Sequence, residues 1–96
     1  MKIRYTPRAL ADLQEIYFYL RKLSPSGADN VRTAIKNSVN AIGREPHRGQ
    51  ATDKHDIKRA PIIRYRYAVY FRVASDAVQI VHIRHTAREL PGRNEL

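Results

Sequence analysis

The first twenty residues change from an alternating pattern to a helical one. In residues 2–6, Ile3 and Tyr5 alternate with basic residues, which predicts a short, half-buried strand. Thr6 can cap a helix, and Pro7 suits its first turn, where a missing N–H group costs nothing. The helix is predicted because apolar residues then recur every three or four positions, at Leu10, Leu13, Ile16, Tyr17 and Leu20.

A second helix is predicted after a break at residues 23–28. Ser24 can cap this helix, and Pro25 can begin it. Gly43 is a natural C-terminal stop, with Pro46 just beyond it. Because few residues join the two helices, we expect them to pack as an antiparallel hairpin. The apolar stripe of the second helix consists of Val31, Ile35, Val39 and Ile42.

The second half of the chain has the pattern of a loop followed by strands. Residues 44–56 are polar and predict a loop, and residues 57–63 predict a strand with Pro61 at an edge or end. Residues 64–73 alternate, and after a turn at 74–77, residues 78–84 predict a central strand. In 64–73 one face carries Tyr65, Tyr67, Val69, Phe71 and Val73, and the other carries Arg64, Arg66, Ala68, Tyr70 and Arg72.

The predicted order is therefore β-α-α-β-β-β within a single domain spanning residues 1–96. This order predicts an α+β fold in which a helical hairpin packs on one face of a small, mainly antiparallel sheet. We expect the tyrosines of "RYRY", residues 64–67, to pack under the helices. The other face of the sheet is expected to be exposed and to carry the arginines.

Composition indicates the chemistry of the partner. The chain has 18 Lys and Arg residues against 9 Asp and Glu, a formal net charge of +9. This excess favours an acidic partner: nucleic acid, an enzyme that acts on nucleic acid, or an acidic protein. The absence of cysteine excludes disulfides and thiolate metal sites. Since no apolar run is long enough for a signal peptide or a membrane span, we expect a soluble cytoplasmic protein.

The sequence offers no convincing metal or cofactor site. His82 and His85 are three positions apart on a predicted strand, so their side chains point to opposite faces. His47 and His55 lie in one polar loop with aspartates, where histidines are usually solvated. There is also no glycine-rich phosphate loop and no paired-carboxylate arrangement. We therefore expect no metal and no cofactor.

Metal-free cleavage of a phosphodiester remains chemically possible. It needs a base, an acid and cations that stabilise the phosphorane charge. His85 is then the best proton shuttle, because arginine cannot act as a base. The alternative is that His85 caps the end of its strand and bonds a backbone group. Suitable groups for such a site are Lys54, His55, Arg59, Arg64, His85 and Arg88.

Several segments together resemble a known family. These are "TPRALADLQEIYFYL" at 6–20, "SPSGA" at 24–28, "PHRG" at 46–49, "YRYAVYFRV" at 65–73 and "VQIVHIRHTARE" at 78–89. The chain resembles the RelE/ParE superfamily of bacterial toxins from type II toxin–antitoxin systems, and within it the ParE branch. His85, Arg88 and Glu89 occupy the places of that branch's closing H-x-x-R motif and its following acid.

The resemblance implies a growth-arresting toxin neutralised by an acidic antitoxin. Such an antitoxin is ParD-like, with a DNA-binding ribbon-helix-helix part and a C-terminal segment that orders on the toxin. The resemblance implies a hetero-oligomer that represses its own operon. The antitoxin is expected at the helical hairpin, on Leu13, Ile16, Tyr17, Leu20, Val31 and Ile35.

The resemblance leaves the toxic mechanism divided between two branches. The ParE branch inhibits DNA gyrase, and the RelE branch cuts mRNA in the ribosome. Relatives that cut RNA usually add a C-terminal tyrosine or an acid–base set, whereas here no tyrosine follows Tyr70. This favours a non-enzymatic gyrase inhibitor whose target-binding residues are Arg64, Arg72, Arg84, His85, Arg88 and Arg93.

Two alternatives to gyrase inhibition stay open. The first is a ribosome-dependent endoribonuclease that uses Lys54, Arg59, Arg64 and His85. The second is an inactive module that only binds its antitoxin.

Overall fold

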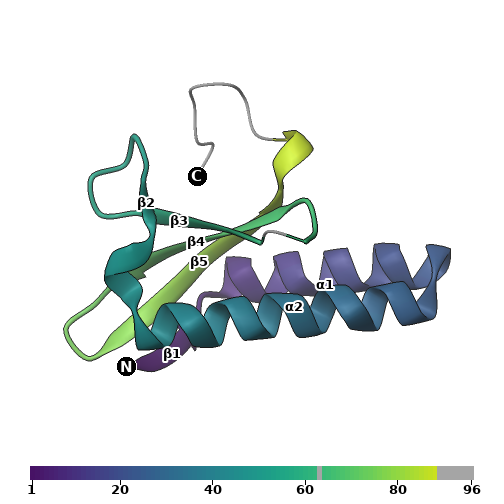
Figure 1. The fold of residues 1–96 in the computed structure, drawn as a ribbon, viewed down its shortest axis with the longest axis horizontal. Coiled ribbons are helices and arrows are strands. Elements are labelled where there is room, and N and C mark those ends of the chain that lie inside the picture. Colours follow the sequence, from purple (N-terminus) through teal and green to yellow (C-terminus); the bar gives the residue numbers. More distant parts are fainter. Residues whose placement is uncertain (63, 89–96) are drawn as a thin grey trace.

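The computed structural model describes residues 1–62 and 64–88, and its arrangement is shown in Figure 1. The strands and helices follow the predicted order, with a short extra strand and two short 3₁₀ helices. The elements are β1 (Lys2–Tyr5), α1 (Pro7–Leu23), α2 (Pro25–Arg44), η1 (Pro46–Arg48), β2 (Gln50–Ala51), β3 (Lys58–Ile62), β4 (Tyr67–Val73), β5 (Ala77–His85) and η2 (Thr86–Arg88).

The five strands form one mixed sheet in the order β1-β5-β4-β3-β2. β1 lies parallel to β5, with Lys2 opposite Ala77 and Tyr5 opposite Ile80, and the other pairs are antiparallel. A parallel pair needs a long connection, and here α1 and α2 lie within it. Both helices cover one face of the sheet (Figure 1), which confirms the predicted α+β class.

The helical hairpin turns at a single serine. The Ser24 N–H donates to the Leu20 carbonyl at 2.8 Å and so ends α1. The Ser24 hydroxyl accepts the Gly27 N–H at 3.1 Å and so begins α2, which starts at Pro25. Thr6 caps α1 in the same way, through the Ala9 N–H at 3.2 Å. These bonds confirm both predicted caps. The caps could be predicted because they depend only on residues close in sequence.

The main core lies between the hairpin and the sheet. The predicted stripe of α2 is buried there, and Tyr67 and Tyr65 of "RYRY" pack against it as expected. From the sheet, the core receives the side chains that alternate towards the helices, namely Val69, Phe71, Val78, Ile80 and Ile83. Burying these side chains is the main favourable term for the fold.

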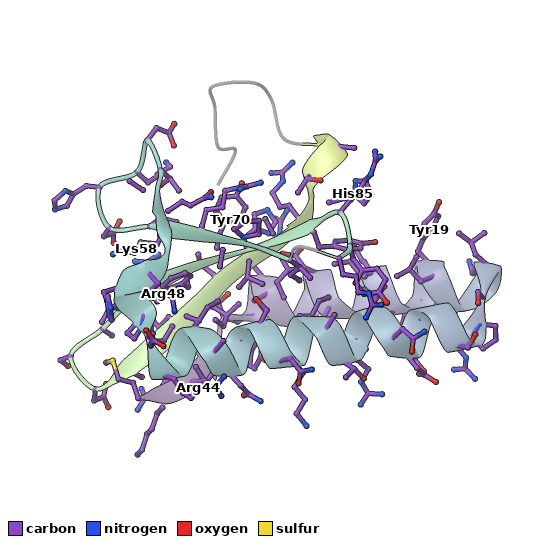
Figure 2. All side chains as sticks on the ribbon, in the orientation of Figure 1. Tyr19, Arg44, Arg48, Lys58, Tyr70 and His85 are labelled. Atoms are coloured by element: carbon purple, nitrogen blue, oxygen red, sulfur yellow. The ribbon has the colours of Figure 1, made fainter. Side chains whose placement is uncertain are left out.

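The opposite face of the sheet corrects one prediction. Tyr70 and Ala68 are 0% exposed and form a cluster with the buried Ile57 and the partly buried Val81. The centre of this face is therefore apolar and is not an exposed basic surface. Figure 2 shows Tyr70 on the side away from the helices. The segment between β2 and β3 carries Ile57 onto this face, and alternation along β4 alone could not indicate that cover.

The boundaries of β4 differ from the predicted strand 64–73. Residues 64–66 form a turn, and β4 begins at Tyr67, whose N–H donates to the Tyr65 carbonyl at 2.8 Å. Arg64 and Arg66 are therefore exposed turn residues. The register also shifts between Tyr70 and Phe71, where a bulge in the pairing with β5 changes which side chains share a face.

Two further expectations need correction. The predicted loop 44–56 contains η1 and β2. β2 pairs with Lys58 and Arg59 of β3 only, so Pro61 lies beyond this pairing at an edge position, as predicted. Leu10 was expected on the buried stripe of α1, but it is 49% exposed. No helix in the described part of the chain is both long and apolar enough to cross a membrane.

Candidate functional site

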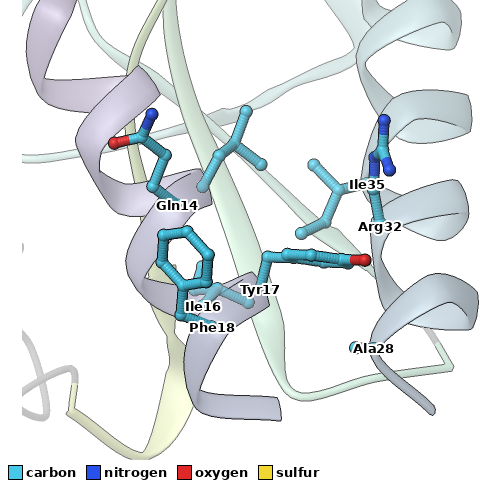
Figure 3. Close-up of a pocket in the computed structure, with 8 residues that line it drawn as sticks. Gln14, Ile16, Tyr17, Phe18, Ala28, Arg32 and Ile35 are labelled. Carbon is cyan, nitrogen blue, oxygen red and sulfur yellow. The ribbon is translucent and has the colours of Figure 1, made fainter. Parts of the chain in front are cut away.

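A groove between the two helices forms the first candidate site (Figure 3). Its cavity has a volume of about 210 Å³ and a mostly apolar lining. Tyr17 spans it: its hydroxyl donates to Asp29 at 3.3 Å, and the Arg32 guanidinium lies 5.6 Å from the centre of its ring. We call this site the helical groove, lined by Leu13, Gln14, Ile16, Tyr17, Phe18, Ala28, Arg32 and Ile35.

Large apolar side chains are exposed on α1 around the helical groove. Phe18 is 58% exposed although it lines the groove, and Tyr19 projects from the helix into solvent (Figure 2). Large apolar side chains left exposed beside an apolar groove are typical of interaction sites. The exposed set on α1 is Leu10, Phe18, Tyr19 and Leu23.

The predicted antitoxin-binding residues lie at different depths. Leu13, Ile16 and Tyr17 line the helical groove, and Ile35 lines it from below while belonging to the buried core. Val31 is also buried in the core, and Leu20 packs against the core outside the groove lining. Phe18 and Arg32 were missed. The signal for Phe18 was an aromatic residue off the apolar stripe of its helix.

A second cavity lies on the other face of the sheet, with a volume of about 360 Å³. Three basic side chains from three elements line it, together with one carboxylate. Arg72 on β4 pairs with Asp56 at 3.4 Å, and Arg8 on α1 pairs with Asp12 at 3.2 Å. We call it the sheet pocket, lined by Arg8, Lys54, Asp56, Ile57, Arg72, Val81 and His82.

The wall of the sheet pocket contains a buried pair that the sequence did not reveal. The Asp12 carboxylate on α1 contacts His82 Nδ1 on β5, and both residues are less than 10% exposed. The same carboxylate oxygen accepts the Ile83 N–H at 2.9 Å. β1 pairs only as far as Ile80, so beyond that point Asp12 satisfies the edge of β5 in place of a strand.

The proposed catalytic residues lie on different segments of the chain. Lys54 lines the sheet pocket, Arg59 on β3 donates to Gln50 at 3.0 Å, and Arg64 lies in the exposed turn before β4. His85 ends β5, where its Nδ1 accepts the Ala87 N–H at 3.1 Å. Its ring meets that of Tyr67 edge-on, with centroids 5.1 Å apart. His85 therefore bonds a backbone group at the end of its strand, and its role as a proton shuttle stays a prediction.

A metal site needs several ligating side chains close together. Residues 1–62 and 64–88 contain no group of three or more His, Cys, Asp or Glu side chains placed to hold a metal ion. His47 and His55 are exposed, as are Asp53 and Asp56 beside them in sequence.

Comparison with known proteins decides the family. The family model described as "ParE toxin of type II toxin-antitoxin system, parDE" matches residues 3–90. The chain belongs to the ParE toxin family. It is 32% identical to Toxin RelE2 of Caulobacter vibrioides over 87 residues, which cover 91% of this chain and 97% of that protein. This level of identity over nearly the whole of both chains agrees with the family match.

The fold of this ParE-family chain also matches a solved structure. The similarity is to a chain in the structure of the chromosomal ParDE TA system from P. aeruginosa, with a TM-score of 0.78 and 24% identity. The match covers 88% of this chain and 95% of that one. It shows that the two chains share their overall fold.

In this ParE-family chain, the predicted target-binding residues are spread along one end and one face of the sheet. Arg72 is exposed in the sheet pocket, Arg84 is half-buried on β5, and Arg64 is exposed in its turn. His85 lies at the end of β5, followed by η2, which includes Arg88. Arg93, like Glu89 of the closing motif, lies outside the described residues.

Proposed function

We propose that this chain is a toxin that inhibits DNA gyrase in the cytoplasm and that an acidic, ParD-like antitoxin neutralises it. The observation that carries the proposal is the match of residues 3–90 to the ParE toxins of parDE systems. The net charge of +9 supports an acidic counterpart for the toxin.

The arrangement of the proposed catalytic residues supports a non-enzymatic mechanism. A general base needs a free ring nitrogen, and Nδ1 of His85 already accepts the Ala87 N–H, so this nitrogen does not serve as one. Lys54 lines the sheet pocket and Arg64 lies in the turn before β4, so the proposed groups come from separate segments. A toxin with this arrangement acts best by binding its target rather than by cleaving a phosphodiester.

The helical groove supports the proposed mode of neutralisation. Its apolar lining and the exposed Phe18 suit the apolar side of an amphipathic antitoxin segment. Arg32 stands beside the aromatic ring of Tyr17, where it can pair with an acidic residue of that segment. A segment that is disordered alone and orders on this surface would bury both features at once.

The experiment that tests the proposal is DNA supercoiling by purified gyrase with the protein titrated in. We expect supercoiling to be lost and cleaved DNA to be trapped. Arg84→Glu should abolish this inhibition, because it reverses a charge on the proposed target surface. Lys36→Glu makes the same change of charge at an exposed position on α2 and should retain inhibition.

The other outcomes point to the two alternatives. Gyrase that is unaffected, together with transcripts cut on ribosomes, would favour the endoribonuclease, and a His85→Gln variant would then test His85 as its proton shuttle. Unimpaired growth when the chain is produced alone would favour an inactive module that only binds antitoxin.

A further inference from the structure

The sheet pocket is lined by four side chains that can bind an anion. Arg8 comes from α1, Lys54 from the segment between β2 and β3, Arg72 from β4 and His82 from β5. These four side chains converge from separate elements on one cavity of about 360 Å³. Since like charges repel, a cluster of three permanent cations needs anions close to it.

His82 gives the pocket a fixed polar group. The side chain is 6% exposed, and it lines the cavity while Asp12 holds its Nδ1. Asp12 also accepts from Arg8 and from the Ile83 N–H, so it acts as a carboxylate and Nδ1 donates to it. The bond to Asp12 uses Nδ1 and leaves Nε2 as the second ring nitrogen, which can bond a ligand. The pair therefore fixes the orientation of the His82 ring, which lines the pocket.

Lys54 and Arg72 differ in how they are paired. The Lys54 backbone bonds the Thr52 hydroxyl, and the Lys54 side chain forms no ion pair with any described residue. Arg72 pairs with Asp56 at 3.4 Å, and both side chains are substantially exposed. Such exposed pairs are weak, so an incoming anion can take the place of Asp56. Asp56 then occupies the pocket as an internal anion when no ligand is bound.

We propose that the sheet pocket binds a phosphate group. Donors that converge from four elements suit a tetrahedral oxyanion better than a planar carboxylate, which presents only two oxygens. The ring of His82 suits phosphate in either protonation state: its lone pair accepts from a P–OH group, and its protonated form donates to a phosphate oxygen. The group belongs to a nucleic-acid backbone or to free phosphate. Arg72 is shared with the predicted target-binding residues, whereas Lys54 and His82 are not among them.

The test follows the side-chain nitrogens of His82 by NMR in the full-length ¹⁵N-labelled protein. Inorganic phosphate is titrated in, with sodium chloride at matched ionic strength as the reference for general screening. We expect saturable shifts at His82 Nε2 with phosphate and none with chloride. A second titration uses a short single-stranded oligothymidylate. Saturation by both ligands assigns a backbone phosphate, and saturation by inorganic phosphate alone assigns a free phosphate.

Matched variants separate this pocket from the general positive charge. Lys54→Gln should weaken phosphate binding at least tenfold, because it removes one charge-assisted hydrogen bond. Lys36→Gln removes the same charge from α2 and should leave the affinity within about twofold. Asp56→Asn should strengthen binding by removing the internal competitor, and Asp53→Asn should not, although it changes the net charge equally.

Three results would overturn the proposal. The first is that neither phosphate nor the oligonucleotide shifts the His82 nitrogens. The second is that Lys54→Gln and Lys36→Gln weaken binding equally, which would show attraction to the whole surface. The third is that Asp56→Asn fails to strengthen binding. None of these variants alters the buried Asp12–His82 pair, so loss of folding does not confuse the comparison.

Discussion

The Asp12 carboxylate on α1 holds the His82 ring on β5, across 70 positions of sequence. Through the same oxygen it also holds the Ile83 N–H at 2.9 Å, so one side chain closes the part of the β5 edge that β1 does not reach. This pair joins the start of the helical hairpin to the central strands. It therefore acts both in stability and in shaping the sheet pocket.

Removal of this carboxylate should destabilise the protein strongly. Asp12→Ala leaves the Ile83 N–H and the His82 ring without their buried acceptor, and we expect the free energy of unfolding to fall by about 2–4 kcal/mol. Urea denaturation followed by circular dichroism measures the change. Arg8→Ala is the control, because it removes only an exposed partner of Asp12 and should cost less than about 1 kcal/mol. Equal losses for the two variants would contradict this role for Asp12.

The sequence predicted the features that depend on neighbouring residues. Thr6 and Ser24 are each followed by proline and cap their helices as expected, and the α2 stripe is buried as its spacing predicts. These signals are local, so three or four consecutive positions are enough to recognise them. The overall order of strands and helices follows from such signals.

The predictions that were wrong, and the contacts that were missed, depend on residues far apart in the chain. Tyr70 is buried because Ile57 returns over the second face of the sheet, and alternation within β4 contains no information about that cover. The Asp12–His82 pair likewise has no local pattern. Its one trace in the sequence is an acidic residue on the inward side of α1, three positions after the buried Ala9. For the same reason, the sequence could not show that Arg8 and Lys54 lie in one pocket with Arg72 and His82.

The two helix caps should differ in strength. The Thr6 hydroxyl accepts the Ala9 N–H and also donates to the Ile80 carbonyl at 3.0 Å, whereas Ser24 is exposed and caps only α2. We expect Thr6→Ala to cost about 1–2 kcal/mol of unfolding free energy, and Ser24→Ala about 0.5–1 kcal/mol. Thermal and urea unfolding of the two variants give the comparison. A greater loss for Ser24→Ala would show that the bond from Thr6 to β5 adds nothing.

Gly49 should not tolerate a side chain, for reasons of space. A Cβ at this position would lie 2.6 Å from Phe71 Cζ and 2.9 Å from Lys58 Cβ, and Phe71 is fully buried. Because the backbone at Gly49 is extended, with φ at −66°, the conflict is steric rather than conformational. We expect Gly49→Ala to lower the free energy of unfolding by about 1–3 kcal/mol.

Gly27 provides the control for this substitution. A Cβ there would meet only Ser24, at 3.2 and 3.3 Å, and alanine favours a helix over glycine by up to about 1 kcal/mol. Gly27→Ala should therefore cost less than Gly49→Ala when both are measured by urea denaturation. The reverse order would mean that Phe71 moves aside without loss.

Phe18 should matter for binding and not for folding. Its side chain is 58% exposed and lines the helical groove, so Phe18→Ala should change the free energy of unfolding by less than about 0.5 kcal/mol. In the complex, the same truncation removes an aromatic anchor, and such anchors are worth about 2 kcal/mol or more. We therefore expect the affinity for the cognate antitoxin to fall at least tenfold, as measured by isothermal titration calorimetry.

Leu23→Ala is the matched control for Phe18→Ala. Leu23 is also exposed on α1 but does not line the groove, so its truncation should leave the affinity nearly unchanged. If Leu23→Ala weakened binding as much as Phe18→Ala, the antitoxin would lie along the exposed surface of α1 rather than in the helical groove.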